Sequence, residues 1–417
     1  MSAASPPLAP ALYWALPFVA MLLAIAVCPL LAPGWWEPNR HKLLVSCILG
    51  LPVVALYVAR EPLALVHAGQ EYLSFVLLLT SLYVISGGIQ LSGDLRATPL
   101  TNTGFLALGS VLASVIGTTG ASMLLIRPVL QTNQERRRVR HTVVFFIFLV
   151  SNVGGLLTPL GDPPLFLGYL QGVPFAWTLS KLALPWLVIV TILLASYLAW
   201  DTWHYRRESP AARERDRVRV EPLRLRGAGN GILLAGVVLA VVALEAPARE
   251  LVIVALAALS LWWTPVEIRR ANGARAYPML EVATLFLGVF LTMIPALALL
   301  RTHAATLGVR APWQFFWATG LMSSFLDNAP TYLTFLALGR GLPLVREVAG
   351  VSHEVLLGIS LGATCMGANT YIGNAPNFMV RSIAESAGVR MPNFFEYMAY
   401  SGAILLPLFA GVTLIFF

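Results

Sequence analysis

The chain contains ten runs of mostly apolar residues that have the length to cross a lipid bilayer. A helix needs about 20 such residues to span the hydrocarbon core. Hydrophobic residues make up 58% of the 417 residues and charged residues only 12%, whereas soluble domains carry about 25% charged residues. The runs lie at 12–32, 43–59, 71–91, 142–170, 178–200, 230–246, 250–265, 279–300, 354–387 and 397–417. The sequence therefore predicts an all-α polytopic membrane protein with about ten transmembrane helices.

Two further apolar stretches, 104–131 and 313–339, are each interrupted by a polar break. The breaks read "GTTG" at 117–120 and "LDNAP" at 326–330. Each half of these stretches is too short to cross comfortably, so we expect two re-entrant hairpins that enter and leave the membrane on one side. Non-helical backbone at membrane depth is tolerated only where protein buries it or where it lines a cavity.

The distribution of basic residues predicts which loops face the inside of the cell. If the N-terminus lies outside and neither hairpin crosses, the inside loops carry 19 Lys and Arg residues and the outside loops carry 6. The six outside residues are Arg60, Arg249, Arg301, Arg310, Arg340 and Arg346. We therefore expect both termini outside, a solvated linker inside at 201–228, and residence in the inner (cell) membrane of a bacterium. The net charge of +8 reflects this topology and not a nucleic-acid surface.

The two halves of the chain repeat each other. "TPLGDPPLFL" at 158–167 matches "TYIGNAPNFM" at 370–379 at four of ten positions, and each stretch interrupts an apolar run that follows a candidate hairpin. We therefore predict a first repeat at 1–200 and a second at 229–417, each with three spans, a hairpin, a broken span and a closing span. Five crossings per repeat is an odd number, so the second repeat is inverted. Inverted repeats with broken helices are typical of secondary transporters, whose sites form at the breaks.

The breaks and the hairpin tips supply small polar side chains that can coordinate an ion or a substrate. Exposed carbonyls and the helix ends at a break add to this capacity, because N-termini attract anions and C-termini attract cations. The candidates in the first repeat are Thr118, Thr119, Ser122, Ser151, Asn152, Thr158 and Asp162. The candidates in the second are Asp327, Asn328, Thr331, Asn369, Thr370, Asn374 and Asn377.

Asp162 and Asp327 are acidic residues within apolar segments, where a charge costs roughly 2.5–3.5 kcal/mol on insertion scales. Such a residue indicates function, although an aspartate can instead cap a half-helix. The sequence leaves Asp162 open between a cap and an ion ligand, and it favours ion binding or proton carriage for Asp327. Arg127 and Arg381 are expected to reach the interface or to pair with a carboxylate such as Glu385. The six histidines fall in loops or at span ends and indicate no proton relay.

Three stretches together resemble the ion transporter superfamily: "SNVGGLLTPLGDPP" (151–164), "LDNAP" (326–330) and "NTYIGNAPN" (369–377). That superfamily includes sodium/proton antiporters, citrate and dicarboxylate carriers, and arsenite pumps. The first stretch is most similar to the sodium/proton antiporter and citrate-transporter branches. The resemblance implies a homodimer in which each protomer has a scaffold domain and a moving transport domain. Dicarboxylate carriers have Ser-Asn-Thr at both hairpin tips, whereas these tips read "GTTGAS" and "LDNAPT", which disfavours a dicarboxylate substrate.

Two functions remain open at this point. Sodium/proton antiport by an elevator-type mechanism is favoured because two acids and no central basic residue lie among the candidates; the alternative is sodium- or proton-coupled transport of citrate or another anion. For sodium, a hard cation that takes oxygen ligands, the predicted ligands are Asp327, Asn328, Asn152 and Asn374. No hydrolase, metalloprotease or P-loop motif occurs, so we expect no enzyme activity and no cofactor besides sodium. The expected partners are the bilayer and a second copy of the chain.

Overall fold

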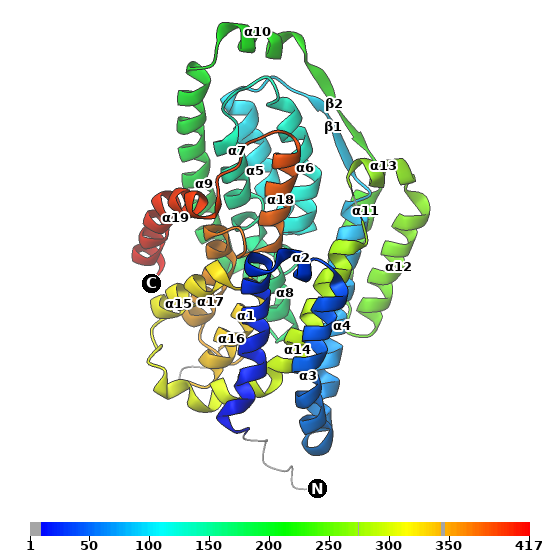
Figure 1. The fold of residues 1–417 in the computed structure, drawn as a ribbon, viewed down its shortest axis with the longest axis vertical. Coiled ribbons are helices and arrows are strands. Elements are labelled where there is room, and N and C mark those ends of the chain that lie inside the picture. Colours follow the sequence, from blue (N-terminus) through cyan, green and yellow to red (C-terminus); the bar gives the residue numbers. More distant parts are fainter. Residues whose placement is uncertain (1–9, 274, 343–346) are drawn as a thin grey trace.

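The structure is a computed structural model that describes residues 10–273, 275–342 and 347–417. Arg346, counted above among the outside residues, and the first nine residues of the first repeat lie outside these ranges. Figure 1 shows an elongated bundle of helices with α10 (Pro210–Val218) at one end and the start of α1 (Leu16–Leu31) near the other. Among the described residues, eight segments are long and apolar enough to cross a membrane. The prediction of an all-α polytopic membrane protein is confirmed.

Each of the ten predicted spans coincides with a helix or with a helix that is broken in the middle. The unbroken spans are α1, α3 (Asn39–Arg60), α4 (Pro62–Ser86), α9 (Phe175–Arg206), α11 (Asn230–Ala243), α12 (Ala248–Trp263), α14 (Tyr277–His303) and α19 (Phe394–Phe416). The broken spans are α7 (Arg140–Leu149), η2 (Val153–Leu157) and α8 (Pro163–Leu170), and α17 (His353–Met366), η4 (Gly367–Asn369) and α18 (Ala375–Ser386). The short connecting helices are η1 (Leu12–Ala15), α2 (Pro33–Trp36), α13 (Val266–Ala271) and η3 (Ala304–Thr306).

The two candidate hairpins are pairs of helices that lie in opposite halves of the molecule. The first pair is α5 (Pro99–Ile116) and α6 (Thr118–Thr132), and the second is α15 (Pro312–Phe325) and α16 (Asn328–Arg340). The first turns at Gly117, whose φ of 80° favours glycine. The expectation that every half is too short to cross is wrong for α5, whose 18 residues are about 27 Å long at 1.5 Å per residue. The other three halves have 15, 14 and 13 residues.

The same local contacts recur at both breaks. Thr158 donates to the backbone oxygen of Ser114 and Thr370 donates to that of Ser324, each over 2.5 Å. A Cβ added to Gly161 would overlap the carbonyl of Gly155, and a Cβ on Gly373 would overlap that of Gly367. Both breaks thus fold back so tightly that only glycine fits. The boundaries of the two repeats and the inversion of the second stay a prediction.

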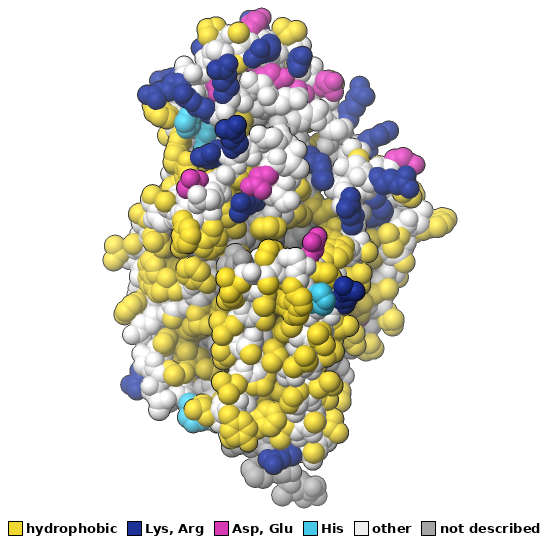
Figure 2. Space-filling view, viewed as in Figure 1, with side chains coloured by type: hydrophobic (Ala, Val, Ile, Leu, Met, Phe, Trp, Pro, Cys, Tyr) yellow, Lys and Arg dark blue, Asp and Glu magenta, His cyan; other side chains and the backbone are white. Residues whose placement is uncertain are grey.

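The helices pack in two groups. The scaffold group is α1, α3, α4, α11, α12 and α14, and the hairpin group is α5–α9 with α15–α19. The groups meet where α4 and α14 contact α6, α8 and α16, and where α11 contacts α5. Figure 2 shows Lys and Arg side chains gathered at the end that carries α10, above a broad hydrophobic surface. This separation is the one expected of a protein that spans a membrane.

The linker at 201–228 is folded over much of its length. It contains the end of α9, then α10, then strand β2 (Glu221–Arg226), which pairs antiparallel with β1 (Gln90–Asp94) between α4 and α5. The Asp216 carboxylate is buried and accepts a hydrogen bond from the backbone N–H of Ala97 over 2.9 Å. The high Arg and Glu content of this stretch predicts a solvated linker and does not reveal that Asp201 and Asp216 are buried.

Candidate transport site

Asp162 is the hub of a buried hydrogen-bond network that joins both hairpin tips to both breaks. Its carboxylate is 1% exposed. It accepts hydrogen bonds from Thr118 Oγ1 over 3.0 Å and from Asn374 Nδ2 over 3.1 Å. Its second oxygen accepts from Asn328 Nδ2 over 2.6 Å. The network therefore draws together four elements that lie far apart in the sequence.

Four helices begin at this network. Thr118 and Asn328 are the first residues of α6 and α16, and Asp162 and Asn374 immediately precede α8 and α18. The N-terminus of a helix carries a partial positive charge. Four such ends, together with three neutral donors, stabilise a carboxylate in a site from which water is largely excluded.

Asp327 has the capping role that the sequence left open for Asp162. Its Oδ1 accepts from the backbone N–H of Ala329 over 3.0 Å, and its backbone oxygen accepts from Thr331 Oγ1 over 2.9 Å. The Asp162 side chain occupies the equivalent position before α8 but makes no capping hydrogen bond there. The two aspartates thus differ in kind: Asp327 stabilises a helix start, and Asp162 is shared among three donors from other elements.

A second set of contacts links the two breaks directly. Asn152 Nδ2 donates to Asn377 Oδ1 over 2.7 Å, and Asn374 Nδ2 donates to the Ser151 carbonyl over 3.1 Å. The hydroxyls of Ser122 and Ser151 are 2.9 Å apart. These polar groups make the centre of the molecule a single connected assembly.

Other predicted residues hold the backbone of the breaks in place. Asn369 donates to Ser324 Oγ over 2.9 Å, beside the Thr370 contact described above. Thr158, Asn369 and Thr370 therefore anchor each break to its own hairpin. Of the four predicted sodium ligands, Asp327 and Asn374 line the cavity described next and Asn328 contacts Asp162, whereas Asn152 bonds to Asn377.

A cavity of about 70 Å³ lies between this network and the scaffold group. Its scaffold wall is mostly apolar and comes from α4 and α14: Leu79, Leu82, Tyr83, Met279, Val282 and Phe286. Its other wall comes from the tips of both hairpins and the ends of both breaks: Ile116, Gly117, Thr118, Thr119, Gly120, Leu160, Gly161, Pro163, Asp327, Asn374 and Ala375. Within the described part of the chain, no Lys, Arg or His side chain lines this cavity.

Several buried oxygens in this region lack a hydrogen-bond donor among the described residues. They are Asn152 Oδ1, Asn328 Oδ1, Thr364 Oγ1 and Asn369 Oδ1. Buried polar atoms are rarely left without a partner, so these oxygens point to a ligand with positive charge or with hydrogens to donate. The geometry is suited to a small cation, to a proton or to water.

Comparison with known proteins identifies the family of the chain. The model of the CitMHS_2 family, described as "Putative citrate transport", matches residues 8–417. The chain belongs to this family. A search of curated proteins found no match. Membership in the family, which is part of the ion transporter superfamily, makes the chain an integral membrane transport protein and agrees with the resemblance drawn from the breaks and tips.

In this member of the family, the intramembrane arginines have structural partners. Arg127 donates to the backbone carbonyl of Asn272 over 2.6 Å, which joins α6 of the hairpin group to the end of α13. Arg381 pairs with Glu385 over 3.0 Å, as the sequence predicted. Neither residue lines the central cavity.

A buried charged cluster that the sequence did not indicate lies at the end of the molecule that carries α10. Asp201 is fully buried and accepts from both Arg136 and His141, over 2.5 and 2.8 Å. His141 lies at the start of a span, as expected, where it is the second residue of α7, but it is buried and only 3% exposed. The available signal was the position of Asp201 directly after the apolar run 178–200, four residues beyond Tyr197.

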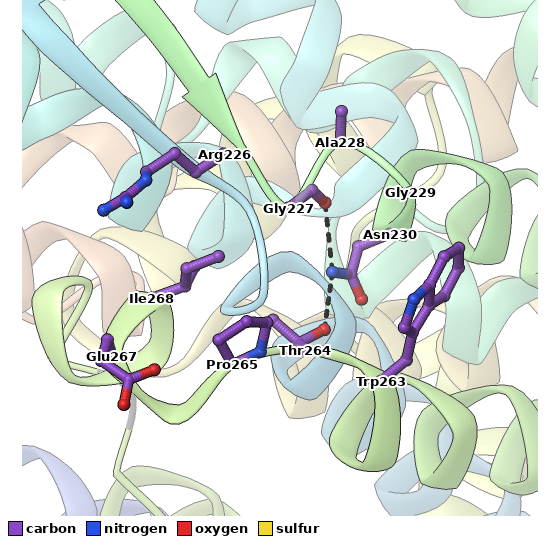
Figure 3. Close-up of a pocket in the computed structure, with 10 residues that line it drawn as sticks. All are labelled: Arg226, Gly227, Ala228, Gly229, Asn230, Trp263, Thr264, Pro265, Glu267 and Ile268. Carbon is purple, nitrogen blue, oxygen red and sulfur yellow. Dashed lines mark hydrogen bonds between the residues drawn. The ribbon is translucent and has the colours of Figure 1, made fainter.

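The structure contains larger cavities away from the two breaks, and the one beside the start of α11 has a structural role. A cavity of about 560 Å³ lies beside the start of α11, lined by Trp263, Glu267 and Ile268 among others. Figure 3 shows Asn230 donating to the Gly227 carbonyl and to Thr264 Oγ1, over 3.1 and 2.9 Å. These polar atoms hold the two scaffold loops together, so we place the transport site at Asp162 and not here.

Proposed function

We propose that the protein is a secondary active transporter that exchanges sodium ions for protons at Asp162 and Asp327. One observation carries the proposal: the Asp327 carboxylate lines a small central cavity, and the Asp162 carboxylate accepts hydrogen bonds from Thr118 and Asn374 in the wall of that cavity. Within the described residues, no basic side chain lines the cavity. A cation in such a place neutralises the site and gains oxygen ligands. We assign the ligands to the carboxylates of Asp162 and Asp327 and to the amide oxygens of Asn328 and Asn374.

Competition between sodium and protons follows from the burial of these carboxylates. Moving a carboxylate out of water disfavours its charged form, so the empty site gains either a cation or a proton. The two ligands exclude each other because each neutralises the same negative charge. Exchange then requires only that the loaded protein changes conformation and that the empty, charged one does not.

The division into two groups supports an elevator-type movement. The hairpin group carries the polar wall of the cavity, and the scaffold group supplies an apolar wall from α4 and α14. Sliding a neutralised site along an apolar wall costs little, whereas sliding a free carboxylate costs several kcal/mol. This difference couples movement to loading.

Reconstituted protein tests the proposal. In proteoliposomes with a pH indicator inside, a sodium gradient should drive a change of internal pH, and an equal citrate gradient without sodium should not. Lithium and potassium gradients measure selectivity, and liposomes with Asp162→Asn protein are the control. A sodium gradient that leaves the internal pH of wild-type liposomes unchanged would overturn the proposal.

Coupled citrate transport is the second candidate, and two observations favour it. The first is that the description of the family names citrate transport. The second is that α6 begins at the cavity without a capping side chain, and that its second residue, Thr119, also lines the cavity. An uncapped helix start attracts a carboxylate. The cavity of about 70 Å³ is well below the roughly 300 Å³ of small ligand pockets, so citrate requires a more open conformation. Uptake of labelled citrate into proteoliposomes under a sodium or proton gradient would support this second function.

We also propose that two copies associate through their scaffold groups. A group that moves cannot form a fixed interface, which leaves the scaffold helices for this purpose. The mass of the purified protein, measured by light scattering and corrected for detergent, should be twice the 45.2 kDa of the chain. A mass of one chain at working concentration would refute the dimer.

A further inference from the structure

A second polar cavity lies at the basic end of the molecule, at the outer ends of the two broken spans. It has a volume of about 520 Å³ and is formed by the start of α7, the end of α9, the segment before α19 and α19 itself. It is lined by Arg136, Arg137, Arg138, Val139, Arg140, His141, His204, Gly388, Val389, Arg390 and Tyr400. Five arginines and two histidines thus surround a space in the range of small-molecule sites.

The positive charge of this cavity is only partly compensated. Asp201 is engaged by Arg136 and His141, and Glu208 accepts from the backbone of Arg138 over 3.2 Å. Across residues 10–273, 275–342 and 347–417, the side chains of Arg137, Arg138 and Arg390 form no ion pair. Several guanidinium groups therefore share one cavity without carboxylates of their own.

The start of α7 adds to the positive potential of the cavity. Basic residues at a helix N-terminus oppose the partial positive charge of that end. The first turn of α7 contains Arg140 and His141 and no acidic residue, and three further arginines precede it. An unfavourable cluster of basic residues at a helix N-terminus is expected where a bound ligand compensates for it. Here the compensating ligand must be negatively charged.

One buried donor is available to such a group. His204 Nε2 lies 3.0 Å from the Trp200 indole N–H, which can only donate. The hydrogen of the neutral His204 ring is therefore on Nδ1. That Nδ1 is buried and has no acceptor among the described residues, and His204 lines the cavity.

We propose that this cavity binds a phosphate-bearing anion with two or more negative charges at the inner membrane surface. Arginine forks match phosphate oxygens in bidentate geometry, and Arg136 and Arg140 are held in place by Asp201 and by the Arg390 carbonyl at 2.8 Å. Two aromatic residues that lie close in sequence to the lining residues, Trp203 and Phe395, are 48% and 79% exposed. Exposed aromatic side chains of this kind are typical of the interface between lipid tails and headgroups. The phosphates can belong to a lipid headgroup or to a soluble diphosphate. The site is independent of the transport function proposed above.

The test measures binding, not transport. Full-length protein in phosphatidylcholine nanodiscs is titrated with a diphosphate lipid such as cardiolipin, and protein in detergent is titrated with inorganic pyrophosphate. The test variant is the triple substitution Arg137→Gln, Arg138→Gln and Arg390→Gln, which leaves the Arg136–Asp201 pair intact. The matched control removes the same charge from exposed positions outside the cavity, with Arg215→Gln, Arg217→Gln and Arg224→Gln.

We expect the test variant to bind at least about tenfold more weakly than wild type, because it loses charge-assisted hydrogen bonds from three guanidinium groups. The control should bind within about twofold. Loss confined to the lipid identifies a headgroup site, and loss confined to pyrophosphate identifies a soluble ligand; either supports the proposal. Equal affinity of wild type and test variant for both probes, or an equal loss in the control, overturns it.

Discussion

The side-chain amide of Asn328 donates to the carboxylate of Asp162 over 2.6 Å, and the two residues are 166 positions apart in the chain. This bond closes the tip of the second hairpin onto the first break. Because Asn328 Oδ1 has no partner among the described residues, the amide can turn over and accept a hydrogen bond from a neutral residue at 162. The pair therefore tolerates loss of the charge without loss of the contact.

Asp162→Asn should abolish sodium-driven proton movement and leave the protein folded. The substitution removes the charge and the titrating proton, and the rotated Asn328 amide preserves the hydrogen bond. Proteoliposome fluorescence measures the exchange, and size-exclusion chromatography with circular dichroism checks the fold. Exchange at the wild-type rate would show that Asp162 carries neither ion.

Asp327→Asn should leave exchange measurable but weaken sodium binding. Asparagine caps a helix as well as aspartate does, so the start of α16 is retained and only the charge is lost. One lost charge-assisted contact of about 1.5–3 kcal/mol should raise the half-maximal sodium concentration by about tenfold or more. The reverse result, with Asp327→Asn inactive and Asp162→Asn active, would restore the roles that the sequence suggested.

Asp201→Ala should destabilise the protein strongly. It leaves the buried Arg136 guanidinium without a counter-charge, and breaking a buried pair costs about 3–5 kcal/mol. The control is Glu385→Ala, which removes a partly exposed partner of Arg381 and should cost no more than about 1 kcal/mol. Thermal unfolding in detergent compares the two variants, and equal melting temperatures would contradict the assigned role of Asp201.

The stability of the β1–β2 ribbon should depend on pH through Asp94. Burial, and then the nearby Glu135 carboxylate, raises the pKa of Asp94 above its ordinary value. A raised pKa in the folded state means that stability falls as pH rises from the unfolded pKa through the folded one. Asp94→Asn should therefore increase the melting temperature at pH 8, and the gain should shrink as the pH falls through that window. A gain that is constant with pH would exclude this cause.

The orientation in the membrane can be tested by cysteine labelling in intact cells. In a background with Cys28 and Cys47 replaced by serine, a cysteine at Ser209 should react with an impermeant reagent only after permeabilisation. A cysteine at Thr306, in the loop between α14 and α15, is the matched outside control and should react in intact cells. Labelling of Ser209 without permeabilisation would invert the proposed topology.

The sequence predicts the spans well because hydropathy is a property of each segment by itself. It also identifies the polar residues at the breaks, since prolines and glycines interrupt the apolar runs there. The sequence could not show that Asp327 caps a helix while Asp162 accepts hydrogen bonds from several elements. That difference depends on Asn328 and Thr118, partners that no local pattern connects to Asp162. Likewise, the burial of Asp201 depends on Arg136 and His141, which precede it by a whole broken span. Local composition could not show that the 201–228 linker docks through Asp216.

The antiparallel ribbon of β1 and β2 contains two of the three connections between the scaffold group and the hairpin group. The chain leaves α4 through β1 to enter α5, and it returns from α9 through β2 to enter α11. A shift of the hairpin group relative to the scaffold must therefore stretch or swing both connections together. An extended strand has almost no slack, at about 3.3 Å per residue. In the proposed elevator-type movement, the ribbon would act as a tether whose length limits the displacement of the hairpin group.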